Sequence, residues 1–275
     1  MVGGIGLSIF LLFSIVSLAN AAEEIRFRAS SKSRSGDPLT LTGKMHKPQG
    51  NAPFPAMVLM HGCGGITGKT EDAWAKRLVS WGYVALELDS FGPRGKKNLC
   101  DDTYVVPENS RAQDAFDAKV FLSQQAVVDN RRIGIMGWGH GGGAVLCAIS
   151  LANMEDYHWQ KRGVSPSDLI KGDGPFKAAV AFYPYCAKSL EDAESPLLIL
   201  IGDKDSWSPA AMCKINVPGS KTNHEIGLKV YPDTYHGFDA EDVNTVVAGY
   251  RVAYDFGATL DAIFRVRDFL AKYLK

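Results

Sequence analysis

The sequence predicts an α/β protein with a mostly parallel central sheet and helices on both faces. Short, nearly continuous apolar runs recur along the chain, as expected of strands that are buried on both faces. Segments with apolar residues at helical spacing lie between these runs. Strands and helices therefore alternate, which is the pattern of a parallel sheet.

The composition indicates one globular unit without a charge excess. The chain has 275 residues, 46% of them hydrophobic, and 30 Lys and Arg balance 30 Asp and Glu. This length allows one sizeable core, and no repeat or linker divides the chain. Balanced charge gives no general attraction for nucleic acid or an anionic membrane, so small neutral or modestly charged ligands are expected.

The N-terminal 21 residues have the pattern of a cleavable signal peptide. An apolar run over 5–18 is followed by Ala-Asn-Ala at 19–21, the small-x-small pattern that signal peptidase cuts. The run is shorter than the ~20 residues that span a bilayer. Because no Lys or Arg precedes it, an uncleaved membrane anchor is the alternative. We expect a secreted or periplasmic protein with one domain over 22–275.

The strands start with a hairpin. Residues 25–28 and 39–46 alternate apolar and polar side chains and flank the turn-forming sequence SKSRSGDP. Further strands are expected at 55–62, 83–90, 132–137, 178–184, 196–202 and 227–233.

Helices are expected between and after these strands. Apolar residues recur at helical spacing over 74–81, 112–120, 140–151 and 263–274. The first of these segments ends at Gly82, a residue suited to a helix C-terminus.

Export would expose the five cysteines to an oxidising compartment. Cys186 and Cys213 flank a predicted strand and its loop and form a plausible disulfide, and Cys63 with Cys100 is a second candidate pair. Cys147 lies among apolar residues of a predicted helix and is expected to be buried. No Cys-x-x-Cys or Cys/His cluster is present, so neither a metal nor a cofactor is expected.

The stretch GIMGWGHGGGA, residues 134–144, is typical of a nucleophile elbow. A buried strand should end in a sharp turn at 137–139 and continue into a helix at His140, as in the G-x-S-x-G motif. In that register Gly139 stands where serine or cysteine belongs.

Other reactive groups follow the predicted strands, at the edge where α/β sheets bind ligands. The glycine-rich turn at 61–65 could offer backbone N–H groups to an oxyanion. Asp203 and Asp205 follow the strand at 196–202, and His236 follows the last strand. Elbow, acid and histidine occur in the chain order of α/β-hydrolase triads.

Five motifs in this order resemble the dienelactone hydrolase family over nearly all of the mature chain. They are HGCGG (61–65), DSFGPRG (89–95), GWGHGGG (137–143), GDKDSWSP (202–209) and YHGFD (235–239). The resemblance implies an α/β-hydrolase fold, and a family activity of cleaving lactones or carboxylic esters with a Cys or Ser nucleophile, an Asp and a His.

The resemblance also implies roles for single residues. Asp205 matches the acid and is favoured over Asp203, which would turn the loop; His236 matches the base. The backbone around Cys63, together with His140, matches the oxyanion hole. At the nucleophile position the chain departs from the family, because Gly139 is there.

The sequence indicates less clearly which residues contact the substrate. Arg94 could bind a substrate carboxylate through its planar guanidinium, with a surface salt bridge as the alternative. Tyr183, Tyr185 and Trp207 could line the pocket, although packing is the better explanation for any single aromatic residue.

Gly139 leaves several interpretations open. Glycine relieves the strain of a positive-φ elbow but removes the atom that would form an acyl-enzyme. The Cys63 thiol could attack instead, or a water activated by His236 and Asp205, or a natural Ser or Cys could have been replaced in this copy. The first hypothesis is therefore weak or lost hydrolysis of a small ester or lactone. The alternative is an inactive pseudoenzyme that binds a carboxylate- or ester-bearing ligand or a protein partner.

Overall fold

The computed structural model describes residues 22–32, 36–150, 174–187, 189–217 and 222–275, so the expected signal segment lies outside the described residues. An eight-stranded sheet has the order β1-β2-β4-β3-β5-β6-β7-β8. Its strands are β1 (Glu23–Lys32), β2 (Pro38–His46), β3 (Phe54–Met60), β4 (Val84–Asp89), β5 (Val128–Trp138), β6 (Ala179–Phe182), β7 (Leu197–Gly202) and β8 (Ile226–Tyr231). β1, β2 and β4 pair antiparallel, and the pairs from β4 through β8 are parallel.

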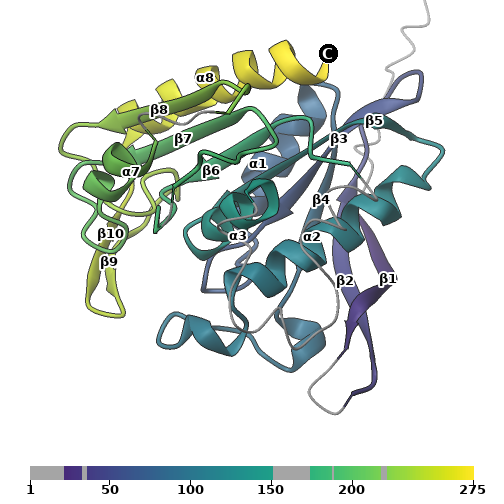
Figure 1. Cartoon of the computed structure of the whole chain (residues 1–275), viewed down its shortest axis with the longest axis horizontal. Helices are drawn as coiled ribbons and strands as arrows, with labels where there is room; N and C mark the ends of the chain where they lie inside the picture. The colour runs from purple at the N-terminus through teal and green to yellow at the C-terminus, as the bar shows by residue number, and fades with distance from the viewer. Residues whose placement is uncertain (1–21, 33–35, 151–173, 188, 218–221) are drawn as a thin grey trace, which may run out of the picture.

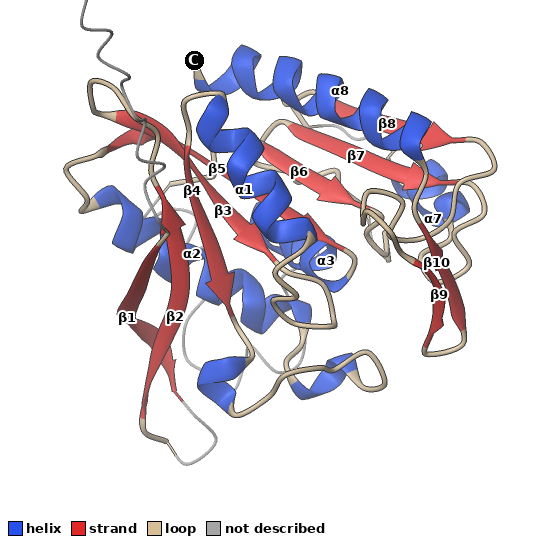
Figure 2. Cartoon of the chain, turned by 180° about the vertical axis from the view of Figure 1, so that it is seen from behind, coloured by secondary structure: helices blue, strands red, loops and turns tan. Residues whose placement is uncertain are grey.

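Helices cover both faces of this sheet, as expected (Figure 1). The helices are α1 (Thr70–Ser80), α2 (Glu108–Ser123), α3 (His140–Ile149), α7 (Ala210–Asn216) and α8 (Phe256–Leu274), with the 3-10 turns η1 (Gly92–Arg94) and η2 (Thr103–Val105). Figure 2 shows α1 and α8 on one face and α2 and α3 on the other. Among the described residues, no helix combines the length and apolar character needed to cross a membrane.

The predicted strands and helices all occur, with shifts at their ends. The fully apolar runs became β3 to β7 because their side chains are buried on both faces of the sheet. The hairpin of β9 (Asn244–Val247) and β10 (Tyr250–Ala253) was not expected. It lies apart from the main sheet, after the loop that carries His236 (Figure 2).

Both expected disulfides are present. Cys63 is bonded to Cys100 and Cys186 to Cys213, while Cys147 takes part in neither disulfide and is buried as predicted. The first bond ties the glycine-rich turn after β3 to the loop after β4. The second holds α7 against the loop after β6.

The start of α3 depends on a close contact between backbones. A Cβ added to Gly141 would lie 2.0 Å from the Met60 carbonyl oxygen, and one added to Gly137 would lie 2.3 Å from the Gly141 oxygen. Only glycine permits this approach. The first turn of α3 is therefore held directly against the end of β3.

Gly141→Ala should destabilise the protein by at least ~2 kcal/mol, because backbone atoms must move to admit the methyl group. Gly257→Ala is the matched control: Gly257 is exposed in α8, and alanine there should be neutral or slightly stabilising. Urea unfolding of both variants checks this. Equal effects of the two substitutions would contradict the close contact.

Candidate active site

Gly139 forms the turn between β5 and α3. Its backbone has φ 50° and ψ −113°, and its N–H donates to the Phe182 carbonyl over 3.0 Å. A Cβ built on Gly139 would lie 3.1 Å from Nε2 of His236. A side chain at this position would therefore point directly at the imidazole of His236.

His236 is oriented by Asp205. Its Nδ1 lies 2.7 Å from Oδ2 of Asp205, and the other carboxylate oxygen accepts the backbone N–H groups of Trp207 and Ser208 over 2.9 and 2.8 Å. Asp205 is buried, whereas Asp203 is exposed. The structure thus brings Asp205, and not Asp203, to the histidine, and leaves Nε2 facing Gly139.

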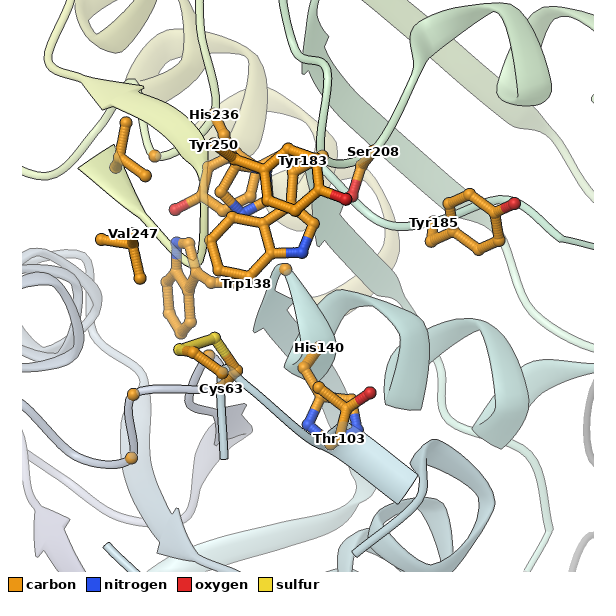
Figure 3. Close-up of a pocket in the computed structure, with 18 of the residues that line it drawn as sticks. Cys63, Thr103, Trp138, His140, Tyr183, Tyr185, Ser208, His236, Val247 and Tyr250 are labelled. Atoms are coloured by element: carbon orange, nitrogen blue, oxygen red, sulfur yellow. A yellow bond between two sulfur atoms is a disulfide. The ribbon is translucent and has the colours of Figure 1, made fainter. Parts of the chain in front are cut away.

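Aromatic rings enclose His236. The ring of Tyr183 lies 4.4 Å from the imidazole and that of Trp207 lies 4.9 Å from it, measured between centroids. Trp207 in turn stacks on Tyr250 of β10 at 5.0 Å. Figure 3 shows Tyr183, Tyr250 and His236 grouped at one side of the cavity. The β9–β10 hairpin therefore supplies part of the wall around the histidine.

Beneath this group, Asp239 is a buried anchor that the sequence analysis did not identify. Its carboxylate accepts hydrogen bonds from Trp74, Trp138 and the Tyr183 hydroxyl over 2.8, 2.9 and 2.8 Å. Burial raises the pKa of Asp239, and the three donors oppose that rise. Trp138 precedes Gly139, and the Tyr183 ring lies near it, so Asp239 fixes the surroundings of the elbow.

The glycine-rich turn lies across the cavity from His236 (Figure 3). Cys63 and His140 both line the cavity. As the first residue of α3, His140 has an N–H without an acceptor inside the helix. The alternative in which the Cys63 thiol attacks the substrate is ruled out, because its sulfur is bonded to Cys100. Its role at the site is limited to its backbone and the disulfide surface.

A buried arginine contacts both the glycine-rich turn at 61–65 and the start of α3. Arg111, on α2, donates to the His61 carbonyl over 2.6 Å and contacts Nδ1 of His140 at 3.1 Å. Burial, and then the charge of Arg111, lower the pKa of His140 well below its usual value. Because arginine only donates, Nδ1 accepts and the neutral ring carries its proton on Nε2. Nothing in the spacing of α2 marked Arg111 as part of the site.

The structure corrects the expectation for Arg94. Its guanidinium forms two hydrogen bonds to Asp114, of 2.8 and 2.9 Å, and a third to the Ser90 carbonyl. Asp114 is fully buried, so this pair is more enclosed than the surface salt bridge considered as the alternative. Arg94 is not among the described residues that line the cavity, whereas Tyr185 and Trp207 are.

The cavity has a volume of about 1150 Å³. Aromatic and aliphatic side chains form much of its wall: Tyr104, Trp138, Tyr183, Tyr185, Val243, Val247 and Tyr250. Among the described lining residues, Lys69 is the single lysine, and no arginine occurs. Glu71 and Glu108 are the acidic groups. The described wall therefore offers little to neutralise a ligand carboxylate.

Comparison with known proteins matches the chain to a family and to solved structures of the same fold. The model of the "Dienelactone hydrolase family" matches residues 41–157 and 166–274. A curated Escherichia coli protein, described as an uncharacterized 31.7 kDa protein in the traX-finO intergenic region, is 29% identical over 109 residues. That match covers 38% of this chain and 35% of the relative, so it spans only about a third of the relative's length.

Solved structures share the fold at low sequence identity. A dienelactone hydrolase from Anabaena variabilis has a TM-score of 0.60 and 16% identity, covering 92% of this chain and 99% of its own. A dienelactone hydrolase-like promiscuous phosphotriesterase from metagenomic libraries has a TM-score of 0.67, 16% identity and coverages of 92% and 99%. Thermogutta terrifontis esterase 2 phosphorylated by paraoxon has a TM-score of 0.63, 18% identity and coverages of 92% and 95%.

Glu108, one of the two acidic residues that line the cavity, gives a pH-dependent prediction. Burial raises the pKa of Glu108 to about 7, and the charge of Arg111 opposes this rise. In the unfolded chain the Glu108 carboxyl ionises at lower pH than it does in the folded protein. Glu108 therefore lowers the free energy of unfolding as the pH rises toward about 7. Glu108→Gln should therefore stabilise the protein at pH 8 by up to ~3 kcal/mol, and far less at pH 5.

Urea unfolding of Glu108→Gln and the native protein at both pH values measures this difference. Glu24→Gln, which changes an exposed carboxylate on β1, is the control. A stability difference for Glu108→Gln that is the same at pH 5 and pH 8 would show that the Glu108 carboxyl is not perturbed.

Proposed function

The chain belongs to the dienelactone hydrolase family, and we propose that its site binds neutral carboxylic esters or lactones but lacks the nucleophile for efficient turnover. One observation carries this proposal. His236 keeps its hydrogen bond to Asp205 and faces residue 139, where glycine offers no attacking atom. The base and acid are thus aligned toward a position that has no nucleophile.

The missing atom sets the expected rate. In a well-studied serine protease, removing the nucleophile costs about 10⁶-fold in turnover. Oxyanion stabilisation and binding alone leave roughly 10³-fold catalysis over water. A water held by Nε2 of His236 is the remaining candidate nucleophile, with Asp205 stabilising the imidazolium that forms. Hydrolysis by this chain is therefore slow.

The cavity wall indicates the kind of ligand. Its volume of about 1150 Å³ exceeds what a small lactone fills, and its side chains are largely apolar. Since Arg94 is paired with Asp114, it does not offer its guanidinium to a ligand carboxylate. An uncharged ester with a bulky apolar or aromatic group matches these walls best.

Binding without turnover is the second candidate function. Gly139 favours binding without turnover. The His236 ring lies so near residue 139 that the ring would have to shift to admit even a Cβ there. A site kept for binding has no need of a nucleophile, and the aromatic rings around His236 would hold the ligand. The two candidates differ in whether bound ester is ever released as acid and alcohol.

We also propose that the protein is exported. The signal-like segment supports this, and so do the two disulfides, since such bonds persist mainly in oxidising compartments. Retention by an uncleaved segment is the alternative, and N-terminal sequencing of the mature protein separates the two.

Gly139→Ser and Gly139→Cys should each raise hydrolysis of aryl esters by at least ~10²-fold over the native protein, because they supply the atom that His236 can activate. The substitutions should cost about 1 kcal/mol of stability through backbone strain. Initial rates on aryl esters with small and bulky acyl groups check the prediction, and bulky groups should be preferred.

The control is His236→Ala in the Gly139→Ser background, which should abolish the gain. A native protein that already turns over as fast as Gly139→Ser would refute the missing-nucleophile account. So would a gain that survives the loss of His236.

A further inference from the structure

A second cluster of polar side chains lies outside the cavity, where α1 crosses the sheet. It comprises His46 at the end of β2, Glu87 in β4 and Asp72 in the first turn of α1. One ligand atom from each residue lies within 4.8 Å of the other two. None of the three lines the cavity, so the cluster is separate from the candidate active site.

Glu87 is the most unusual member. It is 1% exposed and stands in the otherwise apolar part of β4. Its Oε1 is 2.5 Å from Nε2 of His46, but its Oε2 is buried with no hydrogen-bond partner. A buried carboxylate oxygen without a partner is costly, and native structures satisfy most such atoms.

Asp72 adds a second carboxylate to the cluster. No hydrogen bond or ion pair joins it to another residue in the described parts of the chain. The neighbouring residue Glu71 is also acidic and buried. Acidic groups therefore outnumber the single imidazole, and the local potential favours a cation.

Two lysines lie near the cluster, but within the described residues neither forms an ion pair with its carboxylates. Lys44 is opposite Glu87 in the β2–β4 register, and Lys76 lies one turn beyond Asp72 on α1. Within the described residues, the ion pair of Glu87 with His46 is the only one that involves this cluster. Apart from His46, no side chain of the described residues therefore lies within ion-pair distance of the two carboxylates.

We propose that His46, Asp72 and Glu87 bind one divalent transition-metal ion, with Zn²⁺ as the best match. One imidazole and two carboxylates are ligands that zinc accepts, and a water would complete the tetrahedral shell. Imidazole in the set favours zinc, copper, iron or nickel over calcium, magnesium or manganese. Binding would require the Asp72 and Glu87 side chains to rotate so that their oxygens and the His46 nitrogen surround one centre.

Such an ion would connect three elements. It would join β2 and β4 to α1, whose first turn contributes Thr70 and Glu71 to the cavity wall. The expected consequence is a more stable α1, independent of any reaction at His236. The proposal does not depend on the function proposed above.

The test is metal binding by the full chain after treatment with a chelator. Titration with Zn²⁺, followed by calorimetry, and with Co²⁺, followed by visible absorption, should give one site with Kd on the order of micromolar or tighter. His46→Ala and Asp72→Asn should each weaken binding at least ~10-fold. Zn²⁺ should also raise the Tm of the native protein, but not that of either variant.

Two controls locate the site. His224→Ala removes a histidine outside the cluster, and His236→Ala removes another histidine that pairs with a carboxylate. Neither should change the affinity for Zn²⁺ or Co²⁺. Asp72→Asn leaves the His46–Glu87 pair intact, so it remains informative if His46→Ala folds poorly. Absence of binding, or binding that is lost in His236→Ala and kept in Asp72→Asn, would overturn the proposal.

Discussion

The hydrogen bond between Asp205 and His236 is the interaction on which the candidate active site depends. Asp205 can hold the imidazole because its second oxygen is fixed by two backbone N–H groups after β7. The ring can face Gly139 because β10 pairs with the histidine backbone: the Ala253 N–H donates to the His236 carbonyl over 3.1 Å. This geometry is present although residue 139 is glycine.

Two buried residues with ionisable side chains, Asp239 and Arg111, hold the surroundings of the site in place. Asp239 holds Trp138 and Tyr183, which both lie next to Gly139, and Arg111 ties the end of β3 to the start of α3. Removing either would leave several buried partners unpaired, which costs more than the net gain of the bonds themselves. Tyr183 has a φ of 38°, so the same framework also holds a strained residue against the histidine.

Local sequence patterns predicted the parts of the molecule that local physics determines. Apolar runs gave β3 to β7, and the chain order of motifs placed Asp205, His236 and Gly139. Contacts between residues far apart in sequence could not be predicted in this way. The pairing of Arg94 with Asp114, the three donors on Asp239 and the grouping of His46 with Glu87 all depend on how the strands and helices pack. The β9–β10 hairpin was missed because each of its strands has only four residues, too few to show a clear alternation of apolar and polar side chains.

The central claim is that this site binds esters without forming a covalent intermediate. Intact-mass spectrometry of the native protein after incubation with paraoxon, and separately with an aryl ester, tests it most directly; Gly139→Ser serves as a positive control for labelling. The account predicts no added mass on the native protein, with saturable quenching of tryptophan fluorescence as the ester fills the pocket beside Trp207. A phosphoryl or acyl adduct on the native protein would show that another residue attacks, and would contradict the account.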